Sequence, residues 1–266
     1  MRATLLIIMT FMAIQLSAQP KVGFAYYDVD KAYDTVPSAA YNDDDFTPLG
    51  RNRWDTERYT HKVKSIAAVL DSMALPLVGL YGVENRQVVR DIAAHCKCDY
   101  TFVHRATNSR DGMNFALFYY GDVFFPERVG TGRGFLLVCG AVGDREVAII
   151  LTRRARSLGP IVEDLRAKEP DRLIFVAGDL YGIDYNSLKL IEATAEAEAL
   201  GHGNTVYGGR WQMFDRILVD PRLEVQGDVF AKRWLLNDSE EPKPTFDRNG
   251  YQGGASKKLP IFCYWR

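Results

Sequence analysis

The segment YQGGASKKLPIF, residues 251–262, has the composition of a loop that presents side chains at the start of a strand. Two glycines, an alanine and a serine are followed by the adjacent residues Lys257 and Lys258, and an apolar segment comes next. Glycine permits tight turns and close backbone approach, which functional loops use. The bland interpretation is an ordinary solvated turn, because lysine side chains are mostly exposed. The surrounding sequence has to decide between these two interpretations.

The composition indicates one soluble globular domain. The chain has 266 residues, of which 47% are apolar and 25% are charged, so it can bury a full core. The formal net charge is −1, which gives no overall basic field for nucleic acid and no acidic excess for a cationic partner. A site for a polyanion would therefore have to come from a local patch.

The first 18 residues have the pattern of a secretory signal peptide. Arg2 precedes an apolar run of about a dozen residues, and the small residues Ser17 and Ala18 follow it. The rival interpretation, a membrane anchor, needs about 20 apolar residues, and no cysteine follows the run for lipid attachment. We expect cleavage after Ala18, a mature domain of residues 19–266, a periplasmic or secreted location, and no membrane attachment after cleavage.

The four cysteines, Cys96, Cys98, Cys139 and Cys263, allow three disulfide pairings in an oxidising compartment. A bond between Cys96 and Cys98 would close a very tight ring, which favours pairing elsewhere. Cys139 and Cys263 lie in apolar runs, where buried free thiols are the simpler interpretation. No second close pair of Cys or His completes a tetrahedral zinc site.

Hydrophobic periodicity predicts many apolar strands with interleaved helices. A helix is expected from Thr56, with Asp55 or Thr56 as N-cap, and two more near residues 85–94 and 185–200. The expected strands cover residues 21–29, 75–83, 114–120, 134–142, 146–151, 172–180, 211–219 and 259–265. This pattern indicates a layered α/β or α+β domain.

Six segments, in this order, resemble the motifs of the endonuclease/exonuclease/phosphatase superfamily, in particular its exported bacterial branch. They are FTPLGRNRWDTERYTHKVKSIAAVL, VGLYGVENR, VHRATNSRDGMNFALFYY, FVAGDLYG, RWQMFDRILVD and YQGGASKKLP. The resemblance extends from Phe24 to Tyr264. It implies a two-sheet β-sandwich flanked by helices, the DNase I-like fold, with the site at one end of the sheets. Active relatives hydrolyse phosphodiester or phosphomonoester bonds with Mg²⁺.

Most of the catalytic positions that the resemblance implies carry other residues here. The metal-binding Glu of the family falls on Gly82, and the His of the middle strand aligns with about Ile149. The Asn of the Gly-Asp-Phe-Asn motif becomes Tyr181, which we expect to fill the former substrate cavity. The terminal Asp and His become Lys257 and Lys258.

The clearest polar residues that survive at motif positions are His104, Asp179 and Asp215. Asp28 replaces the Asn of the opening strand and is still able to hold a cation. A structural role is the leading interpretation of His104. Glu84 lies two residues beyond Gly82, about 6.6 Å along a strand, too far to replace the lost ligand.

We therefore expect a non-catalytic binding module on this scaffold, with no Mg²⁺ cofactor. Even at an effective dielectric near 20, a lysine 4 Å from a unit positive charge costs roughly 4 kcal/mol. The alternative is a divergent phosphoester hydrolase with a rearranged site that uses Lys258 or His104.

Three roles remain open for the two lysines. They lie in a solvated turn, or they receive an anionic ligand in the remnant cleft with help from Arg153, Arg154 and Arg216. In the third, a lysine forms an internal ion pair with Asp179 or Asp28 in place of Mg²⁺. Other partners stay unspecified, and no strong signal indicates nucleic acid.

Overall fold

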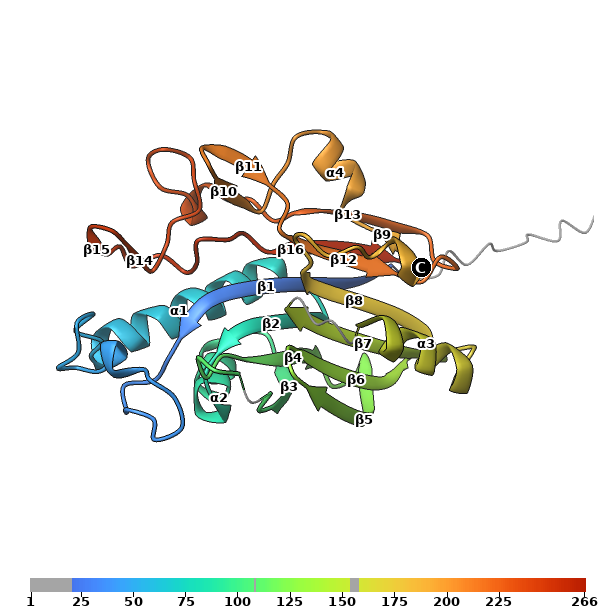
Figure 1. Ribbon diagram of the computed structural model, residues 1–266, viewed down its shortest axis with the longest axis horizontal. Coiled ribbons are helices and arrows are strands. Elements are labelled where there is room, and N and C mark those ends of the chain that lie inside the picture. The colour runs from blue at the N-terminus through green and yellow to red at the C-terminus, as the bar shows by residue number, and fades with distance from the viewer. Residues whose placement is uncertain (1–20, 108, 154–157) are drawn as a thin grey trace, which may run out of the picture.

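A computed structural model describes residues 21–107, 109–153 and 158–266. Two six-stranded sheets lie face to face, with helices on their outer sides (Figure 1). This confirms the predicted two-sheet sandwich. The predicted signal peptide, residues 1–18, lies outside the described residues. Within them, no helix has the length and apolar character needed to cross a bilayer.

The first sheet has the strand order β13-β16-β1-β2-β4-β3, in which β1 and β2 are parallel and the other pairs are antiparallel. Its strands are β1 (Val22–Ala32), β2 (Leu77–Val83), β3 (Tyr100–Arg105), β4 (Asn114–Tyr120), β13 (Val225–Val229) and β16 (Ile261–Trp265).

The second sheet has the order β5-β6-β7-β8-β12-β9, in which β7 and β8 are parallel and the other pairs are antiparallel. Its strands are β5 (Phe124–Gly132), β6 (Phe135–Val142), β7 (Arg145–Arg153), β8 (Leu173–Asp179), β9 (Ile191–Glu192) and β12 (Asp215–Val219). Two small hairpins are added, β10 (Thr205–Tyr207) with β11 (Arg210–Gln212) and β14 (Phe246–Asp247) with β15 (Gly250–Tyr251).

Three helices cover the outer faces of the sheets. Helices α1 (Thr56–Met73) and α2 (Arg86–His95) pack on the first sheet, and α3 (Leu158–Lys168) packs on the second. The predicted cap of α1 is correct, because Asp55 accepts a hydrogen bond from the Arg58 amide. The main core lies between the sheets, where one side of each central strand is buried.

The predicted helix over residues 185–200 is wrong. That segment forms a short 3₁₀ helix, Asn186–Leu188, then β9, then the five-residue helix α4 (Ala195–Ala199). Lys189 adopts a left-handed conformation, with φ of 51°, which interrupts the chain direction before β9 pairs with β12. Strand pairing therefore overrides the helical composition.

All four cysteines are free thiols in the structure, so none of the possible disulfides forms. Cys139 and Cys263 are buried in the cores, as their apolar surroundings indicate, while Cys96 and Cys98 are half-buried.

Candidate functional site

Three of the candidate aspartates meet at one end of the space between the sheets. Asp28 continues the side of β1 that carries Phe24 and Tyr26 into the main core, because side chains alternate along a strand. Asp179 and Asp215 face each other as cross-strand partners where β8 ends and β12 begins. All three are nearly buried.

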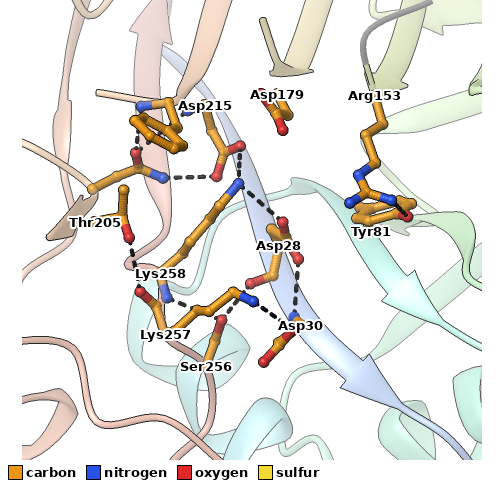
Figure 2. A network of polar contacts seen from close by, with 12 residues as sticks. Asp28, Asp30, Tyr81, Arg153, Asp179, Thr205, Asp215, Ser256, Lys257 and Lys258 are labelled. Carbon is orange, nitrogen blue, oxygen red and sulfur yellow. Dashed lines mark hydrogen bonds and ion pairs between the residues drawn. The ribbon is translucent and has the colours of Figure 1, made fainter. Parts of the chain in front are cut away.

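Lys258 reaches into this group and pairs with two of its carboxylates. Its Nζ lies 2.7 Å from Oδ1 of Asp215 and 3.0 Å from Oδ2 of Asp28 (Figure 2). The Lys258 side chain is only 7% exposed, and that of Asp215 is 1% exposed. Because Asp28 belongs to the first sheet and Asp215 to the second, one ammonium group bridges the two sheets.

The backbone of the terminal loop is fixed so that Lys258 points inward. Ser256 donates its hydroxyl to the carbonyl of Asp28 at 2.7 Å and accepts the amide of Lys258 at 3.1 Å. Asn204 is fully buried, donates to Oδ2 of Asp215 at 2.7 Å and accepts the Phe214 amide at 2.9 Å. Neither positioning residue was predicted from the sequence: Ser256 lies within the terminal motif YQGGASKKLP, and Asn204 lies outside the six motifs.

The charge states of Lys258 and Asp215 depend on two opposing effects, the cost of burial and the attraction between the two groups. Burial opposes the charge on Lys258, but the carboxylates of Asp215 and Asp28 outweigh it and raise the pKa of Lys258 well above its usual range. Burial raises the pKa of Asp215 to about 6, against the attraction of Lys258. At neutral pH the lysine is therefore a cation held between two carboxyl groups, and it cannot act as a base.

Lys257 has a different environment from its neighbour. Its side chain is 61% exposed, and its Nζ lies 3.2 Å from Oδ1 of Asp30. Of the three roles considered for the lysines, the solvated turn describes Lys257 and the internal ion pair describes Lys258. The partners are Asp28, as expected, and Asp215, whereas Asp179 had been the other expected partner.

Gly82 is closed to any side chain. Its φ is +93°, and an added Cβ would lie 1.9 Å from the carbonyl oxygen of Asp30. Asp30 itself has a φ of 61°, and the β1–β2 register shifts between Asp28 and Ala32. The backbone of β1 thus occupies the position that a carboxylate-bearing residue at 82 would need.

Comparison with known proteins agrees with this architecture. Residues 23–135 match the model of the Endonuclease/Exonuclease/phosphatase family. The resemblance to that superfamily is confirmed. No curated protein sequence matches the chain.

Solved structures with the DNase I-like fold match this chain over 92–93% of its length. Truncated TDP2 from Caenorhabditis elegans has a TM-score of 0.60 and 15% identity, covering 92% of this chain and 97% of that one. An endonuclease/exonuclease/phosphatase from Bacteroides vulgatus has values of 0.59 and 11%, with 93% and 99% covered. A mannosyl-6-phosphatase from Bacteroides thetaiotaomicron has values of 0.58 and 13%, with 92% and 99% covered. At these identities the matches show a shared fold.

The residues present do not fit the Mg²⁺ ion of active superfamily members. Mg²⁺ needs oxygen ligands in near-octahedral geometry. Here an ammonium group already lies between Asp28 and Asp215, and Gly82 offers neither a ligand nor space for one. Among the residues that the structure describes, no three Asp, Glu, His or Cys side chains are arranged to hold a metal.

Ile149, the residue that the resemblance places at about the superfamily's His, lies away from the ion-pair group. Ile149 is buried in the main core and pairs with Phe175, well inside the sandwich. Four residues further along the same face, Arg153 pairs with Asp179 at the site end of β7. Its Nη1 donates to the Tyr81 hydroxyl at 2.8 Å, and its guanidinium lies over the Tyr81 ring (Figure 2).

Tyr181 does not fill a cavity as expected. Its side chain stays on the surface, 44% exposed, and stacks on Phe214 with ring centroids 4.1 Å apart. It follows β8 immediately, and its amide donates to Oδ1 of Asp179.

The remaining candidates lie apart from the ion-pair group. His104 is on the edge strand β3, three strands and about 14 Å from β1, and its Nδ1 contacts the carbonyl of Phe115. Arg216 faces the other side of its strand and pairs with Glu192 and Glu198. Glu84 accepts the Asp34 amide, and burial raises its pKa to about 7. Arg154 lies outside the described residues.

Proposed function

We propose that this chain is a non-catalytic binding protein on the endonuclease/exonuclease/phosphatase scaffold. The observation that supports it is the position of Lys258, whose ammonium group is bound to Asp28 and Asp215. A permanent positive charge between these carboxylates repels a divalent ion and neutralises the groups that would hold it. The closed position at Gly82 supports the same conclusion independently.

The proposal is tested by hydrolysis assays with bis(p-nitrophenyl) phosphate, p-nitrophenyl phosphate and plasmid DNA. Mg²⁺, Mn²⁺ and Ca²⁺ are each added, and Asp179→Ala serves as the matched background control. We expect equal, baseline rates for the two proteins. Metal-dependent turnover in the wild type that disappears in Asp179→Ala would overturn the proposal.

A divergent hydrolase is the alternative, and the shared fold with a mannosyl-6-phosphatase gives it support. A metal-free mechanism through Lys258 predicts turnover that survives chelator and disappears in Lys258→Ala. The double ion pair argues against this, because a doubly paired ammonium is neither a base nor a nucleophile.

We also propose that the protein acts outside the cytoplasm, because residues 1–18 carry the pattern of a signal peptide. Expression of the full chain in a Gram-negative host should yield periplasmic protein whose N-terminus is Gln19. Recovery from the cytoplasm with residues 1–18 still attached would contradict the proposal.

A further inference from the structure

The ion-pair group is a poor place for the anionic ligand considered from the sequence. Lys258 has two carboxylates for one ammonium, and its side chain is almost fully buried. An incoming anion would meet Asp28 and Asp215 before it met an available positive charge. Among the described residues, Lys258 itself is therefore not the group that would receive an anion.

A recess of about 400 Å³ lies between the segment that follows β3 and the tip of the β5–β6 hairpin. This volume is in the range of small-molecule pockets. The described residues that line it are Ala106, Thr107, Arg110, Thr131, Gly132 and Arg133. Two exposed arginines and two threonines therefore line one hollow, and none of these six residues is acidic.

The hairpin wall of the recess is held in place by β7. The carbonyl of Gly134 accepts the Arg153 amide at 2.8 Å and the Thr152 hydroxyl at 3.2 Å. Gly134 has a φ of 80°, which a tight turn after Arg133 requires. The backbone that carries Arg133 is thus fixed before any ligand binds.

The opposite wall is fixed by a buried amide. Oδ1 of Asn114 accepts both the amide and the hydroxyl of Thr107, at 2.7 and 3.0 Å. Beyond Arg110, the Tyr33 hydroxyl donates to the carbonyl of Asp111 at 2.7 Å. Pre-organised walls lower the ordering cost of binding.

The two arginines of the recess retain their charge for a ligand. Arg110 and Arg133 are exposed, and within the described parts of the chain neither has an ion-pair partner. The nearby carboxylate of Asp111 lies 3.7 Å from Arg153 instead. Three other recesses are lined in part by acidic residues. The first has Asp122 and Asp144, the second has Asp144, Glu146 and Asp171, and the third has Asp228.

We propose that this arginine recess binds the oxyanion group of a small molecule, a phosphate or a carboxylate held between Arg110 and Arg133. Guanidinium forks match both groups with paired, charge-assisted hydrogen bonds. Thr131 adds an exposed hydroxyl to the hairpin wall, whereas the Thr107 hydroxyl is already donated to Asn114. This proposal names a ligand class for the proposed binding protein. Its biological role rests on the proposed function, but binding of an oxyanion to the recess does not.

The test is calorimetric titration at low ionic strength with inorganic phosphate, glycerol 3-phosphate and succinate as probes. The Arg110→Gln/Arg133→Gln variant is compared with Arg51→Gln/Arg248→Gln, which removes the same charge from two exposed arginines elsewhere. We expect saturable binding of at least one probe, weakened ten-fold or more in the first variant and less than two-fold in the second. The probe that binds identifies the oxyanion.

Three results would overturn the inference: no saturable binding of any probe, equal weakening in both variants, or binding that survives both. Melting temperatures of the two variants verify that each is folded. The hydrolysis assay measures turnover and this titration measures binding, so the failure of one proposal is distinguishable from the failure of the other.

Discussion

Lys258 is the residue on which the account depends. An ammonium group taken out of water is costly unless it is paired and hydrogen-bonded, and Lys258 has two carboxylate oxygens within 3.0 Å. Its neighbour Lys257 contacts only Asp30 and remains 61% exposed. The two lysines are adjacent in the sequence but differ greatly in what their removal should cost.

Replacing Lys258 by Ala should lower the free energy of unfolding by about 3–5 kcal/mol, because two buried carboxylates lose their counter-charge. Lys257→Ala is the matched control and should change it by less than about 1 kcal/mol, as an exposed ion pair does. Urea denaturation at pH 7 measures both. Equal effects of the two substitutions would show that the Lys258 pair is not a stabilising centre.

At the residue scale, the sequence predicted the site group only in part. An internal pair between a lysine and Asp28 was among the open alternatives, but Asp215 was not its expected partner. Asp179 and Asp215 are neighbours on adjacent strands, so the sequence cannot tell which of them pairs with the lysine. In the structure, Asn204 donates a hydrogen bond to Asp215, the residue that pairs with Lys258. Ile149 and Arg153 lie on the same face of β7, so alternation along the strand cannot tell which of them reaches the site end.

At the scale of secondary-structure elements, β1 and β2 have closed around the former ligand position. Gly82 needs its positive φ, and Asp30 occupies the volume of its missing Cβ. Restoring a carboxylate therefore requires rebuilding two strands.

Gly82→Glu should yield no hydrolase activity and should destabilise the fold by on the order of 3 kcal/mol, through left-handed strain and a backbone clash. Gly82→Ala should cost a similar amount without adding a carboxylate. Gly121→Ala, where the nearest atom is 4.0 Å away, is the control and should stay within about 1 kcal/mol. A stable, metal-binding Gly82→Glu variant would contradict the closed geometry. Thermal denaturation and the phosphodiester assay give the two readouts.

Helix α1 carries a buried lysine, Lys62, which connects the helix to β1 and to the terminal loop. Nζ of Lys62 donates to the carbonyls of Val29 and Ala255 and to the hydroxyl of Thr245, at 2.7, 2.8 and 2.5 Å. It thus holds the segment that precedes Ser256 against β1. Burial lowers the pKa of Lys62 to about 8, although Asp30 and Asp28 oppose the shift.

Lys62→Met should cost about 2 kcal/mol at pH 7, because buried acceptors lose their donor. The cost should grow with pH. An unfolded chain keeps a lysine protonated to about pH 10.4, whereas folded Lys62 releases its proton near pH 8, so wild-type stability gains by up to about 3 kcal/mol across this window. Denaturation of both proteins from pH 7 to 10 measures the gap, and Lys64→Met is the exposed control. A gap that stays flat or narrows would contradict the shifted pKa.

Element prediction succeeded where pattern and motif agreed. The apolar stripe from Thr56 and the cap at Asp55 predicted α1 correctly. Residues 185–200 have helical composition, yet β9 forms there because β12 offers it a free edge. Such an edge exists only in the assembled sheet, so composition alone could not reveal it.

For the whole molecule, the order of the six motifs along the chain predicted the sandwich. The sequence could not predict which residues of the two different sheets come into contact. Lys258 joins Asp28 of the first sheet to Asp215 of the second, and the arginine recess joins two segments far apart in the chain. Both arrangements depend on how the two layers are stacked.

The central claim is that the Lys258 ammonium holds the position of a cation between Asp28 and Asp215. Crystals of the wild-type protein soaked in MnCl₂ and measured at the manganese edge test it most directly. The account predicts no anomalous peak between these carboxylates, with the Lys258 side chain in place. A manganese peak there, with Lys258 displaced, would contradict the account.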